Sequence, residues 1–199
     1  MITDIKQSLI IAATRLMAED GYDGVSVRSI CQEAKVNNNS ITYHFGGKEK
    51  LFNAMVDDFQ NDLYETPSHY LSSEFNNAGE FRLCLSMFFE ESIVRLLKNS
   101  QILRILMREG KRVKSSSHLK AFHEIIHRFI TMGQDKGIIN KNLDPSFVTG
   151  AFMDRIFIQV MNHEHITANF DTDITNLKYR KEWIHNNLEL FLNGLFVKE

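Results

Sequence analysis

Apolar residues recur at three- and four-residue intervals along nearly the whole chain, and this spacing constrains the fold more than any other feature. Such spacing places apolar side chains on one face of a helix, whereas a half-buried strand needs strict alternation. Only two prolines and ten glycines interrupt the 199 residues, too few for the many turns of an all-β fold. The sequence therefore predicts an all-α protein of about nine helices.

Residues typical of turns and helix caps separate the segments that have helical spacing. Gly21 is placed to end the first helix, Ser26 to begin the second, and Asn37 to begin a short third helix. Asp144-Pro145 marks a later start, because an acid caps a helix and proline suits its first position. The expected helices span about 5–20, 27–34, 37–45, 51–67, 79–99, 101–112, 116–136, 144–163 and 175–196.

The composition is that of an ordinary globular protein, with 43% hydrophobic and 24% charged residues and a formal net charge of −2. Two cysteines, Cys31 and Cys84, cannot build a disulfide framework. No apolar run approaches the roughly 18 to 20 residues that span a bilayer. The N-terminus carries acids through its apolar positions and does not resemble a signal peptide. We therefore expect a cytoplasmic protein with no membrane partner.

Charge is unevenly distributed along the chain. Residues 57–91 hold eight acids and one arginine, a net charge of −7, and residues 98–136 hold nine bases and three acids, a net charge of +6. Two solvated helix faces would explain both regions. Alternatively, Lys111, Arg112 and Lys114 form a surface near an anionic partner.

Residues 26–48 have the form of a helix-turn-helix unit, whose last helix lies in the DNA major groove. Three asparagines and a serine at 37–40 open the third expected helix, although these residues are poor helix formers. An asparagine amide can donate and accept hydrogen bonds at an adenine edge, and the Thr42 methyl group can pack against thymine. The pattern favours base recognition, but a polar connector without a partner fits the same residues.

Groups suited to phosphate flank these base-reading candidates. The side chains of Tyr43, His44 and Lys48 can bind phosphate oxygens. Backbone N–H groups at Ser26-Val27 and Gly47-Lys48 can do the same, because helix N-termini attract anions.

Residues 21–52 resemble the DNA-binding segment of the TetR family of bacterial transcriptional regulators. The matching residues are Gly21-Tyr22, Val25-Ser26-Val27-Arg28, Ile30, Ala34, Val36, Tyr43-His44-Phe45, Lys48-Glu49 and Leu51-Phe52. With the helix before it, the resemblance covers about residues 4–56, over a quarter of the chain. It implies a three-helix DNA-binding domain at 1–47 and a helical bundle for effector binding and dimerisation at 48–199.

The resemblance implies a transcriptional repressor that binds a palindromic double-stranded operator as a homodimer and is released by a small-molecule effector. Asn38, Asn39 and Thr42 would face bases, and Arg28 would contact phosphate or a base edge. The residues expected to contact DNA are Ser26, Val27, Arg28, Lys35, Asn37, Asn38, Asn39, Thr42, Tyr43, His44 and Lys48.

Two residues depart from the family pattern. Lys35 stands where the family usually has glycine, so we expect a left-handed backbone there or a further phosphate contact. Thr42 stands where a larger aromatic residue is common, which bears on the operator preference.

The resemblance also implies an apolar effector pocket and a dimer interface made by the last two helices. A hydrophobic or amphipathic small molecule would suit the pocket. Its expected lining is Met55, Phe59, Leu63, Phe88, Ile105, Phe122, His123, Ile126, His127, Phe129 and Phe152. The expected interface residues are Phe152, Phe157, Val160, Leu188, Phe191 and Leu195.

Residues 123–127 spell HEIIH, the pattern of zinc peptidases, on an expected helix. His123 and His127 would share a face, with Glu124 as a general base, but no recognisable third ligand follows. A metal-dependent hydrolase and a helical interaction module that does not bind DNA are therefore the alternatives. The preferred prediction is a regulator without enzymatic activity, cofactor or bound metal.

Overall fold

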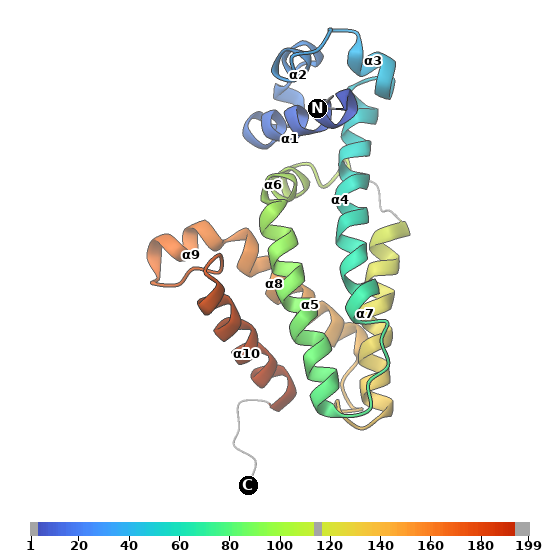
Figure 1. The fold of residues 1–199 in the computed structure, drawn as a ribbon, viewed down its shortest axis with the longest axis vertical. Helices are drawn as coiled ribbons and strands as arrows, with labels where there is room; N and C mark the ends of the chain where they lie inside the picture. The colour runs from blue at the N-terminus through green and yellow to red at the C-terminus, as the bar shows by residue number, and fades with distance from the viewer. Residues whose placement is uncertain (1–3, 114–116, 194–199) are drawn as a thin grey trace. The chain divides into compact units, whose positions relative to one another are not determined.

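The computed structural model describes residues 4–113 and 117–193, and this part of the chain contains helices and no strand (Figure 1). The all-α prediction is confirmed. The helices are α1 (Ile5–Gly24), α2 (Val27–Glu33), α3 (Ser40–Phe45), α4 (Lys48–Tyr70), α5 (Ala78–Lys98), α6 (Ser100–Arg108), α7 (Ser117–Asp135), α8 (Pro145–Met161), α9 (His163–Asn169) and α10 (Leu177–Asn193). Within the described ranges, no helix is both long and apolar enough to cross a membrane.

The chain forms two compact units. The first comprises Met1–Asn61 and Asn99–Ser116, and the second comprises Asp62–Lys98 and Ser117–Glu199. Helix α4 begins in the first unit and ends in the second, while α6 belongs to the first unit with α1, α2 and α3. The functional boundary expected after residue 47 stays a prediction.

The first unit is a small helical head with α6 packed against α1. Helices α1, α2 and α3 contact one another and bury apolar side chains such as Leu9, Ile30 and Ile41 completely. The end of α1 bends at Gly21, whose φ of +75° favours glycine. A Cβ at this position would also lie 3.2 Å from the Arg108 guanidinium of α6, so glycine permits the close approach.

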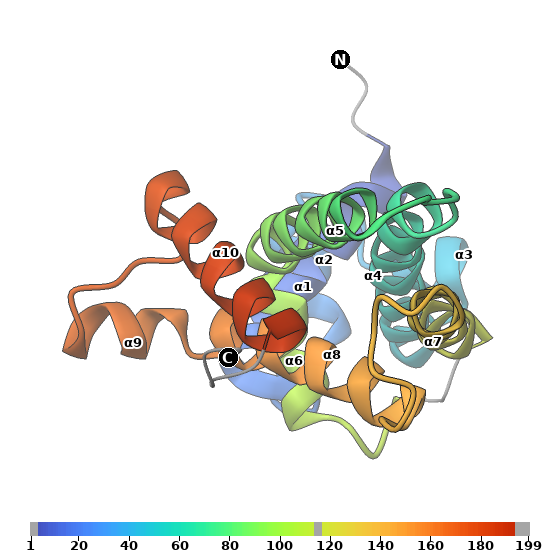
Figure 2. The same cartoon turned by 90° about the horizontal axis from the view of Figure 1, so that it is seen from below.

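The second unit has an aromatic core. Phe129 of α7 stacks on Phe81 of α5 with 4.7 Å between ring centroids, and Phe75 packs edge-on against both at 5.0 Å. Helix α8 contacts α5 and α7, while α10 lies along α5, as both views show (Figure 1, Figure 2). Phe89 of α5 contacts both Phe152 of α8 and Trp183 of α10. The core of this unit therefore contains aromatic side chains contributed by four helices and the loop before α5.

Several helix boundaries differ from the prediction, among them the ends of α8 and α4. Helix α8 ends at Met161, and a separate helix α9 follows, because Asn162 leaves the helical path and its amide donates to the Ile158 carbonyl at 3.0 Å. Helix α4 continues to Tyr70, three residues beyond the expected stop at 67. Proline removes one backbone donor, and near the end of a long helix one missing bond does not end it.

Candidate nucleic-acid interface

Helix α2 begins at a reciprocal cap formed by two serines. The Ser26 hydroxyl accepts from the backbone N–H of Ser29 at 3.0 Å, and the Ser29 hydroxyl accepts from the N–H of Ser26 at 3.0 Å. The two bonds satisfy donors that a helix start otherwise leaves open. The predicted start at Ser26 is confirmed, and the cap fixes where exposed Arg28 projects from the first turn.

The turn after α2 passes through a left-handed lysine. Lys35 has φ of +55°, as the departure from the family glycine predicted. The turn is closed by backbone bonds from Lys35 N–H to the Gln32 carbonyl at 3.1 Å and from Val36 N–H to the Cys31 carbonyl at 2.9 Å. These backbone bonds support a conformation that an L-residue adopts at a cost of about 1–2 kcal/mol.

Replacing Lys35 with glycine should raise the free energy of unfolding by about 1 kcal/mol, because glycine adopts this φ without a Cβ clash. Gln32→Gly is the matched control, since it places the same residue in helical α2 and should lower that free energy by about 1 kcal/mol. Urea unfolding followed by circular dichroism measures both changes. A loss of stability in both variants would contradict the proposed strain.

Helix α3 starts later than expected, at Ser40. The Asn37 side chain does not cap a helix; its Oδ1 accepts from the N–H of Asn39 at 2.9 Å, and the Ser40 N–H bonds to the Asn37 carbonyl at 2.9 Å. Asparagine commonly forms such turns with the backbone two residues on. Residues 37–39 are consequently an exposed turn that leads into α3.

Helix α3 presents a polar outer face above one buried anchor. Ile41 is fully buried, whereas Thr42 and Tyr43 are exposed, and the Tyr43 side chain is 85% exposed. The ring of Tyr43 packs edge-on against His44, with 4.9 Å between centroids. With Asn38 in the preceding turn also exposed, base-reading and phosphate-binding candidates lie along α3 and the turn before it.

Lys48 has a different environment from these exposed candidates. Its Nζ donates to the Tyr22 carbonyl oxygen at 2.6 Å and lies 4.2 Å from the centroid of the Tyr22 ring. Burial lowers the pKa of the Lys48 ammonium. The start of α4 is thereby held to the end of α1, and the predicted role of Lys48 in phosphate binding stays a prediction.

An ionic cluster that sequence analysis missed joins the end of α1 to the segment after α6. Glu109 accepts from the backbone N–H of Tyr22 at 3.1 Å, and Arg112 bonds to Asp23 at 2.7 Å and to Glu109 at 3.0 Å. The Arg112 guanidinium also lies over the Tyr22 ring, 4.6 Å from its centroid. Arg112 thus has internal acidic partners, while Lys114 lies outside the described residues.

The residues predicted to line an effector pocket are divided between the two units. Met55, Phe59 and Ile105 are buried in the first unit. In the second unit, His123 is exposed, Leu63 and His127 are half-buried, and the following are buried: Phe88, Phe122, Ile126, Phe129 and Phe152. Phe152 also lines a small apolar hollow of about 150 Å³ between α8 and α10. The pocket assignment stays a prediction.

The residues predicted for a dimer interface also differ in exposure. Phe157 and Phe191 are half-buried, and Leu195 lies outside the described residues. The other three, Phe152, Val160 and Leu188, are buried within the second unit of a single chain. Their assignment to the interface stays a prediction.

The HEIIH segment lies on α7, as expected. The rings of His123 and His127 face each other with 6.3 Å between centroids. Across residues 4–113 and 117–193, no three side chains of histidine, cysteine, aspartate or glutamate come close enough together to hold a metal ion.

Residues 9–55, which include α2, α3 and the start of α4, match the model of the family described as bacterial regulatory proteins, tetR family. Residues 9–55 are therefore a DNA-binding segment of the TetR-family type. The TetR-family match covers the capped α2, the left-handed turn and the exposed face of α3. The resemblance predicted from the sequence is therefore confirmed.

Similarity to known transcriptional regulators extends over nearly the whole chain. The transcriptional repressor NicS of Pseudomonas putida is 22% identical, covering 96% of this chain and 92% of its own length. The TetR-family regulator PfmR of Thermus thermophilus has the same fold, with a TM-score of 0.74, 19% identity and full coverage of both chains. AibR, solved in complex with isovaleryl coenzyme A and operator DNA, gives a TM-score of 0.70 at 15% identity, covering 97% of this chain and all of that chain.

Proposed function

We propose that this protein is a repressor that binds a palindromic operator as a homodimer and is released by a small-molecule effector. The observation that carries the proposal is the outer face of α3, where Tyr43 is 85% exposed beside a turn of three exposed asparagines. A large aromatic side chain so exposed contributes little to stability but suits contact with the DNA backbone. The repressor NicS and the AibR complex with operator DNA support the same function.

In this proposal, α3 enters the major groove and α2 crosses the backbone. Asn38, Asn39 and Thr42 contact base edges, while Tyr43 and His44 bind phosphates. The exposed side chains of Arg28 and Lys35 extend the phosphate-binding surface along α2 and the turn. Lys48, at the start of α4, contributes a further phosphate contact.

Dimerisation through α8 and α10 would place two heads on one operator. Besides the predicted Phe157 and Phe191, both helices carry exposed apolar side chains, Ile158 on α8 and Leu190 on α10. Two-fold symmetry requires matching half-sites about 34–36 Å apart, one helical turn, or a multiple of that spacing.

An effector would release the operator by favouring a conformation that binds DNA more weakly, with a coupling of about 1–3 kcal/mol. AibR was solved with isovaleryl coenzyme A, an amphipathic ligand, which supports a small amphipathic effector here. We propose the second unit as the part of the chain that binds it.

Selection of bound sequences from a random duplex pool, at two salt concentrations, tests the proposal. We expect a palindrome whose affinity falls as salt rises, because phosphate contacts release counterions. Salt-sensitive binding without a common sequence would refute the assignment of Asn38, Asn39 and Thr42 to bases. Absence of binding by an effector-free preparation would refute the proposed function itself.

Tyr43→Phe should weaken binding to operator and to random duplex by the same factor, about 2- to 10-fold, because the lost hydroxyl bonds phosphate and not a base. Fluorescence anisotropy with both duplexes measures the two affinities. Because Tyr43 is 85% exposed, the variant should unfold at the same denaturant concentration as the parent protein. A loss confined to the operator would assign Tyr43 to base recognition instead.

A further inference from the structure

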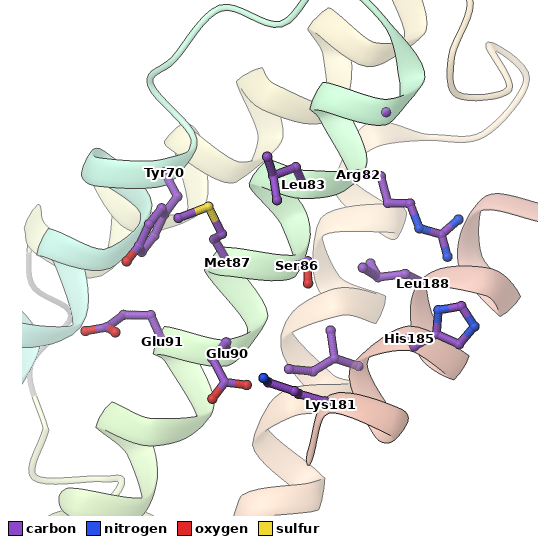
Figure 3. Close-up of a pocket in the computed structure, with 12 residues that line it drawn as sticks. Tyr70, Arg82, Leu83, Ser86, Met87, Glu90, Glu91, Lys181, His185 and Leu188 are labelled. Carbon is purple, nitrogen blue, oxygen red and sulfur yellow. The ribbon is translucent and has the colours of Figure 1, made fainter. Parts of the chain in front are cut away.

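A hollow of about 620 Å³ opens in the second unit, between α5, α10 and the end of α4 (Figure 3). Its volume lies within the range of small-molecule sites, about 300–1,000 Å³. Two large apolar side chains of α5 line it, Leu83 and Met87, which are 59% and 44% exposed. Ile184 and Leu188 of α10 complete the apolar part of the wall. An apolar molecule in the hollow would cover the exposed surface of α5.

Most charged side chains in the wall form ion pairs. Arg82 is paired with Glu189, a residue of α10 outside the wall. Glu90 accepts from Arg180 at 2.9 Å, and Glu91 accepts from Arg95 at 2.7 Å. Each of these three wall charges therefore has a partner of opposite charge within the second unit.

Lys181 of α10 carries the remaining formal charge of the wall, and His185 is a second basic side chain on the same helix. Lys181 and His185 are exposed and one helical turn apart, and Figure 3 shows Lys181 extending from α10 toward α5. Among the described residues, neither forms an ion pair with an acid, although His185 interacts electrostatically with Glu189 of the same helix. The α10 side of the hollow thus presents a basic pair above an apolar surface.

The opposite end of the hollow is acidic. Arg95 lies beside Glu91 and is shared with Asp62 and Glu65. One guanidinium therefore serves three carboxylates, so an anionic group is disfavoured at the Glu91 end. The charges at the two ends favour one orientation of a bound ligand, with its acidic group at α10.

We infer that this hollow binds a small amphipathic acid, whose carboxylate contacts Lys181 and His185 and whose apolar chain lies on Leu83 and Met87. The inference rests on the proposed effector response and names the chemical class of the effector and its site. An ammonium-headed amphiphile is disfavoured by the basic pair, and a neutral one would leave Lys181 without an acidic partner.

Isothermal titration calorimetry of the full chain without DNA tests the site, with dodecanoate as the probe. We expect one dodecanoate per chain, and at least tenfold weaker binding of dodecan-1-ol and dodecyltrimethylammonium. Lys181→Gln/His185→Gln should weaken dodecanoate binding at least tenfold and abolish its advantage over dodecan-1-ol. Lys178→Gln is the matched control, because Lys178 is exposed on α10 and outside the wall.

The apolar part of the wall has a separate test. Met87→Gln keeps the side-chain length and removes an exposed apolar contact, so it should weaken dodecanoate and dodecan-1-ol alike. Parent-like dodecanoate binding by the Lys181/His185 double variant would overturn the proposed site. Equal or tighter binding of dodecyltrimethylammonium would overturn the proposed ligand class.

Two further measurements are needed. The first distinguishes a ligand site from a contact between two copies of the chain. The second distinguishes failure of the ligand site from failure of DNA binding. If a second copy of the chain occupies the hollow, the double variant should change the oligomeric state in sedimentation velocity, and that result would overturn the ligand site. Operator binding by the effector-free double variant should equal that of the parent protein. Intact operator binding with no dodecanoate binding by the parent protein would refute the ligand site and leave the proposed repressor function standing.

Discussion

Phe129→Ala should lower the free energy of unfolding by about 3–5 kcal/mol, the largest stability change we expect from a single substitution. Phe129 is fully buried, stacks on Phe81 at 4.7 Å and packs edge-on against Phe75 at 5.0 Å. Truncation removes the apolar contact of a whole ring and two aromatic pairs, and leaves a cavity among helices that cannot fully collapse.

Phe147→Ala is the matched control, because the same side chain is lost where it is 71% exposed. We expect a change within about 0.5 kcal/mol, as for most surface positions. Urea unfolding followed by circular dichroism and by tryptophan fluorescence measures both variants, since Trp183 lies in the same unit as Phe129. Similar losses in the two variants would show that burial in the aromatic core does not set the stability of this unit.

Asn38→Ala should reduce discrimination at one base position of each half-site by about 1–3 kcal/mol, a 5- to 150-fold change. The side chain lies in the exposed turn before α3, where an amide can bond twice to an adenine edge. Binding to random duplex should change little, because that binding depends on phosphate contacts. Competition between the selected operator and its single-base variants measures the effect.

Asn37→Ala provides the contrast for Asn38→Ala. The Asn37 Oδ1 accepts from the Asn39 N–H, so this substitution disturbs the turn itself and should weaken operator and random DNA together. Equal losses on both DNAs for Asn38→Ala would instead place Asn38 in the same structural role and remove it from base recognition.

Local features of the fold were predictable from the sequence because they depend on neighbouring residues. The starts of α2 and α8 were predicted from Ser26 and Asp144, whose side chains bond to backbone groups two or three residues away. The left-handed turn was predicted at Lys35 from the comparison with the family pattern. The DNA-binding candidates were predicted from residue type, because the polar residues at 37–40 are poor helix formers.

Boundaries set by competing local bonds were less predictable. The Asn37 side chain could cap a helix or close a turn, and Oδ1 would accept the hydrogen bond in either case. Asn162 could continue α8 or end it, and its bond to the Ile158 carbonyl accompanies the end. The sequence is compatible with both conformations at each asparagine, and small differences in packing decide which one forms.

An all-α fold, the starts of several helices and the polar face of α3 follow from the sequence, because periodicity and capping are short-range. Which surfaces meet is visible only in the three-dimensional structure. It placed α6 in the first unit, joined Glu109 to Tyr22 across 87 positions, and buried Leu188 within its own chain. It also placed Lys181 opposite α5 at the hollow. Periodicity shows which face of a helix is apolar, but it does not show which other helix covers that face, because that choice depends on contacts between residues far apart in the chain.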